Sequence, residues 1–168
     1  KMNIANIELQ KGNIVNAIKL LEVIVNENDS YQEAKANLAL AYRRAGKIDR
    51  SIKVYEKIVF DGPWSLKAKF NYGTTLITNK GFEQGWRYYE NRWKIPPQNK
   101  LTWPLQDKSI WKGEKGKRVV VWKEQGIGDD IIFLSLVPEV KEMCDTLSVY
   151  VDPRLQSLCK RTMPDIHF

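Results

Sequence analysis

The first half of the chain carries apolar side chains at helical spacing. Between residues 48 and 60, Ile48, Ile52 and Tyr55 recur every three or four positions, with polar residues between them. Because an α-helix turns once in 3.6 residues, such side chains share one face and can be buried together. We therefore predict a helix over residues 48–60, paired with a preceding helix over residues 31–44.

This pattern recurs with a period of about 34 residues, a length typical of paired-helix repeats. Gly12 and Gly46 stand one period apart, and a third unit spans residues 66–94, with Gly81 displaced by one place. A helix pair cannot bury its apolar face alone, so such units stack into an array of about three or more. Residues 1–10 cover only the end of a first helix, so we expect further repeats before them.

The repeat resembles the tetratricopeptide (TPR) family, whose units have this same length. In the second repeat the positions that match the family's pattern are Leu38, Ala39, Tyr42, Gly46, Ser51, Tyr55, Ile58 and Pro63. The resemblance implies an α-solenoid with a concave groove that binds proteins or peptides. We expect Gly46 to take a left-handed conformation between two helices and Pro63 to end the second one.

Asparagines form one column of this repeat, because Asn3, Asn37 and Asn71 stand one period apart. By resemblance to TPR proteins, and to the asparagine ladder of O-GlcNAc transferase, this position faces the groove. Each amide there could donate to and accept from an extended peptide backbone. The basic residues expected near the groove are Arg43, Arg44 and Lys67. They favour an acidic partner, whereas the alternative is that the asparagines serve helix packing.

A tryptophan-rich connector follows the repeats. The aromatic stripe of residues 81–94 predicts a last helix, which Pro96 and Pro97 end. Residues 95–117 are expected to be irregular, and five of the six tryptophans lie between residues 86 and 122. Basic residues among aromatic ones can bind single-stranded nucleic acid. Since the basic residues form no dense run, we interpret the tryptophans as packing anchors and do not favour a nucleic-acid partner.

The last third of the chain alternates between apolar runs and helical spacing. The predicted order is a strand at 118–122, a helix at 130–143, a strand at 146–152, a helix at 153–162 and a third strand at 166–168. Pro138 is expected to kink or split the first of these helices, and Pro153 to begin the second. This alternation is typical of a parallel α/β sheet, so we predict a partial Rossmann-like segment that opens a larger domain.

Four motifs make the chain resemble a bacterial protein family. They are GFEQGWRYYENRW from Gly81, W-x-G at Trp111, VVWKEQGIGDDIIF from Val120 and D-P-R-L from Asp152. In that family TPRs precede a glycosyltransferase-like domain of the B-type fold, similar to heptosyltransferases and, more remotely, to O-GlcNAc transferase. The resemblance covers nearly the whole chain and implies that its α/β segment forms the acceptor side of a transferase.

The loop after the first predicted strand carries the candidate chemistry. In heptosyltransferases the Gly-Asp pair of this loop includes a proposed general base, and the matching pair here is Gly128-Asp129. The resemblance thus implies that Asp129 deprotonates an acceptor hydroxyl during attack on a sugar's anomeric carbon. The residues assigned to the acceptor loop with it are Glu124, Gln125, Gly126, Gly128 and Asp130. The alternative is that Asp129 is only the N-cap of a helix beginning near Asp130.

Other kinds of site are excluded by the residues present. A dinucleotide-binding G-x-G-x-x-G motif would need glycine where Ile131 stands, and no P-loop lysine follows the glycines. His167 is the only histidine of the sequence, and Cys144 and Cys159 form no C-x-x-C pair. We therefore expect no cofactor and no metal site.

Composition adds the broad class. Hydrophobic residues make up 43% and charged residues 28% of the chain, as in soluble globular proteins. No apolar run approaches the roughly 20 residues that span a bilayer. Two cysteines without a motif are typical of free thiols in a reducing compartment, so we expect a cytoplasmic location. The net charge is +7, and residues 86–123 hold ten basic but three acidic residues.

These patterns together predict three parts: TPR repeats over residues 1–94, a Trp/Pro-rich connector over 95–117 and the start of a Rossmann-like α/β domain over 118–168. The predicted function is a peptide-binding module joined to the acceptor side of a glycosyltransferase-like domain, inactive as a transferase on its own. The alternative is a pure interaction scaffold whose α/β segment caps the solenoid.

Overall fold

The computed structural model describes residues 1–60, 65–95, 108–124 and 126–168. The chain divides into two compact units, a helical unit at Lys1–Thr102 and an α/β unit at Trp103–Phe168. The predictions made for Pro63, Pro96, Pro97 and Gln125 lie outside the described residues.

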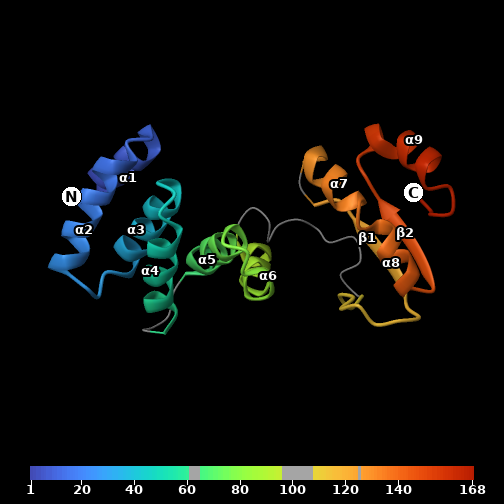
Figure 1. Ribbon diagram of the computed structural model, residues 1–168, viewed down its shortest axis with the longest axis horizontal. Helices are drawn as coiled ribbons and strands as arrows, with labels where there is room; N and C mark the ends of the chain where they lie inside the picture. The colour runs from blue at the N-terminus through green and yellow to red at the C-terminus, as the bar shows by residue number, and fades with distance from the viewer. Residues whose placement is uncertain (61–64, 96–107, 125) are drawn as a thin grey trace. The chain divides into compact units, whose positions relative to one another are not determined.

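The helical unit is built from helices that pair in chain order (Figure 1). The pairs are α1 (Met2–Lys11) with α2 (Ile14–Glu27), α3 (Gln32–Arg44) with α4 (Ile48–Phe60), and α5 (Leu66–Thr78) with α6 (Phe82–Tyr89), which a 3₁₀ turn, η1 (Glu90–Lys94), extends. Successive second helices begin one period apart, at Ile14, Ile48 and Phe82, and the same interval separates the starts of α3 and α5. The period found in the sequence is therefore a period of the backbone.

The residue with a left-handed conformation in the turn of each pair recurs once per period, whereas the glycines do not all keep this spacing. Gly12 and Gly46 have φ angles of 83° and 73°, and Lys80, a further period on, has 62°. The left-handed conformation thus falls on Lys80, although glycine stands one place later at Gly81. Position in the repeat overrides residue preference here, at a cost of about 1 kcal/mol for a side chain in this region.

Small residues occupy both sides of the crossing within each pair. On the first helices the column is Ala5, Ala39 and Gly73, and on the second helices it is Ala17, Ser51 and Gly85. In the third pair the helices approach so closely that a Cβ added at Gly73 would lie 2.6 Å from the Tyr89 backbone nitrogen. In the second pair the buried Ser51 hydroxyl donates to the Ala39 carbonyl oxygen over 2.7 Å.

The core of the helical unit lies between one pair and the next. Leu38, Ala41 and Tyr42 of α3 cluster with Ile18 and Leu21 of α2 in one buried group. A second group joins residues of α4 and α5, namely Tyr55, Ile58, Tyr72 and Leu76, with Ala39. Helices α3 and α5 therefore each pack on their own partner with one face and on the preceding second helix with another.

The α/β unit contains a parallel sheet. Strand β1 (Arg118–Trp122) pairs in parallel with β2 (Thr146–Tyr150), so that Val120 lies opposite Ser148. On the other edge of β2, Ser148 forms a parallel bridge with His167, and the Val149 N–H donates to the His167 carbonyl oxygen over 2.8 Å. The predicted third strand is thus reduced to a single bridge at His167, and the sheet itself has the two strands β1 and β2 among the described residues.

One face of the sheet holds the core of this unit. Val119, Leu147 and Val149 alternate along the strands and pack against Val137 of α8 (Val137–Met143) and Leu155 of α9 (Pro153–Thr162). The opposite face leaves Val120 48% and Tyr150 73% exposed. Alternation with one covered face is what period-2 strands produce when helices lie on one side only.

The helix expected over 130–143 is split near Pro138, as predicted, into α7 (Ile127–Leu134) and α8, with Pro138 in the first turn of α8, where its missing N–H costs nothing. Two predicted helix limits in the chain were wrong. Helix α7 begins three residues earlier than expected, because Gly126 is its N-cap. The last helix of the helical unit likewise ends earlier, since residues 90–94 form a 3₁₀ turn.

The close helix crossing makes a stability prediction. We expect Gly73→Ala to destabilise the helical unit by roughly 1–3 kcal/mol, because the new methyl group must push apart backbone that does not yield. Chemical denaturation followed by far-UV circular dichroism measures this. The matched control is Gly128→Ala, where a Cβ would meet no atom within 4 Å. Equal stability of the Gly73 variant and the native chain would refute the tight crossing.

Candidate functional site

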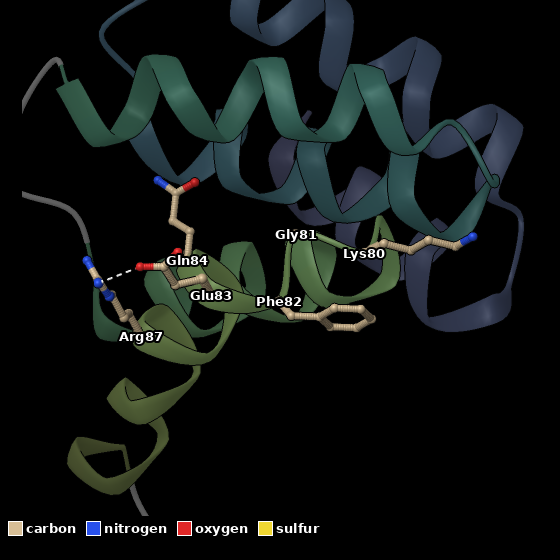
Figure 2. A pocket seen from close by; sticks show the side chains of 6 residues that line it. All are labelled: Lys80, Gly81, Phe82, Glu83, Gln84 and Arg87. Atoms are coloured by element: carbon tan, nitrogen blue, oxygen red, sulfur yellow. Dashed lines mark hydrogen bonds and ion pairs between the residues drawn. The ribbon is translucent and has the colours of Figure 1, made fainter. Parts of the chain in front are cut away.

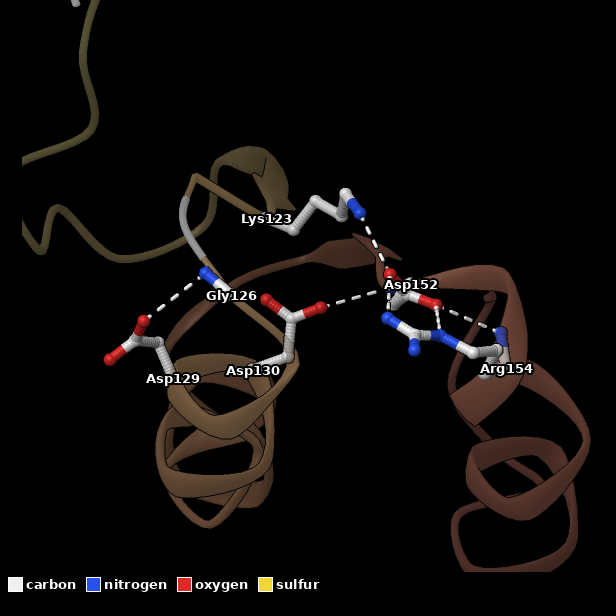
Figure 3. Close-up of polar contacts among 6 residues, drawn as sticks. All are labelled: Lys123, Gly126, Asp129, Asp130, Asp152 and Arg154. Carbon is white, nitrogen blue, oxygen red and sulfur yellow. Dashed lines mark hydrogen bonds and ion pairs between the residues drawn. The ribbon is translucent and has the colours of Figure 1, made fainter.

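The candidate site lies where β1 and β2 end. Lys123 follows β1, Asp152 lies just beyond β2, and the first turns of α7 and α9 begin beside them (Figure 3). Because parallel strands end at the same edge, residues distant in sequence meet here. The edge brings together Lys123, Gly126, Asp129, Asp130, Asp152 and Arg154.

Asp129 is not the N-cap that the sequence suggested. It is the third residue of α7, and its Oδ2 atom accepts the backbone N–H of the N-cap Gly126 over 3.2 Å. A carboxylate at this position closes one half of a capping box and interacts favourably with the positive helix end. Its other carboxylate oxygen has no hydrogen bond among the described residues, and the side chain is half-buried. One oxygen therefore stays available to a ligand.

The two glycines of the loop are not required by the fold of this unit. Gly126 has ordinary extended dihedral angles, φ −80° and ψ 164°. A Cβ at Gly128 would meet nothing within 4 Å, and one at Gly126 would make only an ordinary contact, 3.8 Å from Asp129 Oδ2. The loop backbone is thus open on the side where those side chains would stand. Glu124, also assigned to this loop, is half-buried.

Asp130 points away from Asp129 and has a structural contact. Its side chain is among the buried ones, 8% exposed, and its Oδ2 atom accepts the backbone N–H of Asp152 over 3.0 Å. Figure 3 shows the two neighbouring carboxylates directed to opposite sides of the helix start. This hydrogen bond links the first turn of α7 to the end of β2. It also holds the Asp130 carboxylate apart from that of Asp129, whereas binding one cation together would require the two carboxylates to be close.

Asp152 is the centre of the polar contacts at this edge. It caps α9 by accepting the Arg154 N–H over 3.1 Å, and its carboxylate receives Arg154 Nε at 2.8 Å and Lys123 Nζ at 3.0 Å. The Arg154 guanidinium, followed by the Lys123 ammonium, holds the pKa of the Asp152 carboxyl well below its usual range. Sequence reasoning missed Lys123 and Arg154, although Asp-Pro directly after a strand is a recognisable helix-start signal.

The asparagine column lies on the first helices of the helical unit. Asn3 is exposed, while Asn37 and Asn71 are half-buried. The Asn37 Nδ2 amide donates to Asn6 Oδ1 of α1 over 2.9 Å. This hydrogen bond links the first helix pair to the second, so part of the hydrogen-bonding capacity of Asn37 is already used. Asn6, three residues after Asn3 and on the same helix face, was not singled out from the sequence.

The three basic residues assigned to the groove differ in their surroundings. Arg43 donates to the Thr74 hydroxyl of α5, and Arg44 Nη1 donates to the Leu9 carbonyl oxygen of α1 over 3.0 Å. Both link neighbouring first helices. Lys67 is exposed and lies one helical turn before Asn71, so that the two share a face of α5.

A shallow pocket lies at the turn between α5 and α6. Figure 2 shows its lining residues, Lys80, Gly81, Phe82, Glu83, Gln84 and Arg87. Within it the Arg87 Nη2 atom donates to Glu83 Oε1 over 2.7 Å, an exposed pair one helical turn apart. None of the predicted site residues lines this pocket, so it adds nothing to either candidate site.

Metal binding and membrane insertion each need a feature that the described residues lack. Over residues 1–60, 65–95, 108–124 and 126–168, no three His, Cys, Asp or Glu side chains are placed to hold a metal ion together. Among the helices of those same ranges, none has both the length and the apolar character needed to cross a bilayer.

The polar contacts of Asp152 make a pH prediction. Its folded-state pKa is depressed, so its stabilising contribution is present above the usual aspartate pKa of about 3.9 and is lost as the pH falls through the folded-state value. We expect native β2 to lose stability below about pH 4 more steeply than in Asp152→Asn, which keeps a capping side chain without the charge. Amide hydrogen exchange at Val149 measures this, and parallel pH profiles would contradict it.

Comparison with known proteins gives one finding of sequence similarity. No protein-family model matches the chain. Protein FlbA of Caulobacter vibrioides is 25% identical to it over 163 residues, which cover 92% of this chain and 27% of FlbA. The chain therefore spans about a quarter of the length of this relative.

Proposed function

We propose that the chain is a TPR-type α-solenoid that binds an extended peptide, joined to the acceptor side of a glycosyltransferase-like domain of Rossmann type. The observation that carries the proposal is the common period of helix starts and left-handed turns, which runs through all three helix pairs. A period of this length in paired helices is the signature of the TPR architecture.

The first helices provide the proposed peptide surface. Helix α3 contacts both α1 and α5, so the asparagine column runs over neighbouring helices. Amide groups at regular intervals suit a peptide backbone, which offers a donor and an acceptor at each residue. Lys67 adds a cation on the same face as Asn71, which favours an acidic peptide.

The loop between β1 and α7 provides the proposed acceptor surface. Loops at the carboxyl ends of parallel strands form the ligand crevice of open α/β sheets. The uncovered Gly126 and Gly128 backbone lies beside the available oxygen of Asp129. In this proposal a sugar-acceptor hydroxyl donates to that oxygen. Asp129 takes its proton as the hydroxyl oxygen bonds to the anomeric carbon of a nucleotide sugar, and the bond from that carbon to the nucleotide phosphate breaks, so that the nucleotide leaves.

A second candidate function is a pure interaction scaffold in which the α/β unit caps the solenoid. The observation that favours it is that Asp129 and Asp130 both accept backbone N–H groups within the α/β unit. Their presence would then be explained by local folding alone. The two candidates differ in whether the stability of the helical unit depends on the α/β unit.

The peptide surface is tested with substitutions in the asparagine column. We expect Asn37→Ala with Asn71→Ala to weaken binding of an extended acidic peptide by about tenfold, because two backbone hydrogen bonds are lost. A screen of labelled acidic and neutral extended peptides, read by fluorescence anisotropy, supplies the ligand. The matched control is Asn6→Ala, which removes the bond to Asn37 but leaves the column intact. If Asn6→Ala weakens binding equally, the column serves helix packing.

The two candidate functions are separated by unfolding the α/β unit within the whole chain. Leu147 is 4% exposed in the core of that unit, so Leu147→Asp should abolish its native structure. If the α/β unit forms part of a separate catalytic domain, the melting temperature of the helical unit stays unchanged. We expect an unchanged melting temperature. It is measured by circular dichroism at 222 nm, a wavelength at which helices give a strong signal. A clear fall in that melting temperature would instead support the capping role.

A further inference from the structure

One tyrosine of the helical unit has a fully buried hydroxyl group. Tyr55 of α4 is 0% exposed, and it clusters with Ala39 of α3 and with Tyr72 and Leu76 of α5. Its ring centroid lies 5.6 Å from that of Tyr72. Among the residues that the structure describes, the Tyr55 hydroxyl has no hydrogen-bond partner. Because a buried polar group without a partner has lost its hydration and gained no bond in exchange, it destabilises the free chain.

Another buried tyrosine of the same unit has the ordinary arrangement. Tyr42 of α3 is 7% exposed, and its hydroxyl donates to Glu22 Oε1 of α2. Nearly all buried polar groups in native structures are paired in this way. The unpaired hydroxyl of Tyr55 is therefore a property of that one position, and it needs an explanation that packing alone does not give.

The Tyr55 hydroxyl points from α4 toward the first helices. The side chain starts on α4 and packs against residues of both α3 and α5, and the hydroxyl is at the far end of the ring. The same two helices carry Asn37 and Asn71 of the asparagine column. The buried hydroxyl thus lies between the two helices that provide the proposed peptide surface.

Arg43 supplies a positive charge near this hydroxyl. Its Nη1 atom donates to the Thr74 hydroxyl of α5, and its other N–H groups make no hydrogen bond or ion pair among the described residues. Burial raises the pKa of the Tyr55 hydroxyl well above its usual range, and the Arg43 charge acts against this rise. The hydroxyl therefore stays protonated at neutral pH, so that both residues have donors that are not used.

We propose that Arg43 and Tyr55 together bind one carboxylate of a ligand, supplied by an aspartate or glutamate side chain of an extended peptide. Two unused donors select an acceptor, and the guanidinium selects a negatively charged one. A carboxylate offers one oxygen to each donor and is small enough to enter between two packed helices. Arg43 is half-buried, so a rotamer change of its long side chain opens the way to the hydroxyl. The peptide as the source of the carboxylate rests on the proposed function, whereas the carboxylate site does not.

The carboxylate site gives the peptide surface a preferred register. A peptide backbone presents the same donor and acceptor at every residue, so the asparagines alone do not distinguish one register from another. A carboxylate held by Arg43 and Tyr55 fixes which peptide residue lies between α3 and α5. The position of the acidic residue, and not only the total charge of the peptide, therefore determines the affinity.

The first test needs no peptide. The whole chain is isotope-labelled at the tyrosine Cζ atoms and titrated with acetate, with inorganic phosphate and chloride at equal ionic strength as the other arms. The Tyr55 signal is identified by its loss from Tyr55→Phe. We expect acetate to shift it saturably in the native chain but not in Arg43→Gln, because the hydroxyl gains an acceptor. No saturable shift, or an equal one with chloride, would overturn the site, and a stronger response to phosphate would overturn its assignment to a carboxylate.

Two Tyr→Phe variants form a matched pair for the second test. Tyr55→Phe removes a hydroxyl without a partner, so the melting temperature of the free chain should not fall. Tyr42→Phe removes the bond to Glu22, so its melting temperature should fall. For an extended peptide with one glutamate, we expect Tyr55→Phe to weaken binding about five- to tenfold and Tyr42→Phe to leave it unchanged. The same peptide with glutamine should not distinguish Tyr55→Phe from the native chain. Equal binding of the glutamate peptide by both variants would contradict the proposal.

Failure of the carboxylate site and failure of the peptide surface give different results. If only the site is wrong, the double asparagine variant weakens peptide binding while Tyr55→Phe and Arg43→Gln do not. If the peptide surface is wrong, no extended peptide binds, and the response of the Tyr55 signal to acetate alone decides whether the site exists.

Discussion

The helical unit depends on the close approach of the two helices in each pair. Small residues stand on both sides of every crossing, and in the third pair both are glycine, so backbone meets backbone. This contact fixes how the first helix is placed on the second, and the left-handed turn must then follow at a set position. That constraint explains why Lys80 takes a positive φ while a glycine stands beside it. It also leaves the remaining faces of each helix free to join successive pairs.

The α/β unit depends on a different interaction, the contacts around one carboxylate. Asp152 caps α9, pairs with Lys123 beyond β1 and, through its backbone N–H, binds Asp130 at the start of α7. Two strand ends and two helix starts are therefore joined at one point. The charged groups there are largely satisfied by one another, and the open part of the edge is the glycine-containing loop beside Asp129. A ligand at this edge would therefore contact the backbone of the loop and one carboxylate oxygen of Asp129, rather than an unpaired cationic side chain.

Much of this arrangement follows from local patterns. The spacing of Ile48, Ile52 and Tyr55 predicts α4, and the apolar run of β1 predicts its strand. Both predictions work because the residues that such an element buries recur at a fixed spacing along the chain. The limits of α7 were misjudged, since Asp129 and Asp130 are both good N-caps and Gly126 gives a weaker signal. Of the candidate site, Asp129 and the glycines were singled out from a motif. Lys123 was missed because its partner Asp152 lies on another strand-to-helix loop, and Arg154 was missed although it follows Asp152 by only two residues.

The sequence by itself determined the repeat period and the order of helices and strands, because these depend on spacing along the chain. Only the tertiary structure decided which polar groups meet. The Asn37–Asn6 and Asp130–Asp152 bonds join residues 31 and 22 positions apart. It also decided that Leu38 and Tyr72, which stand one period apart, are both buried between successive helix pairs. The physical reason is that a hydrogen bond or a buried face requires a partner, and partners are set by how elements pack.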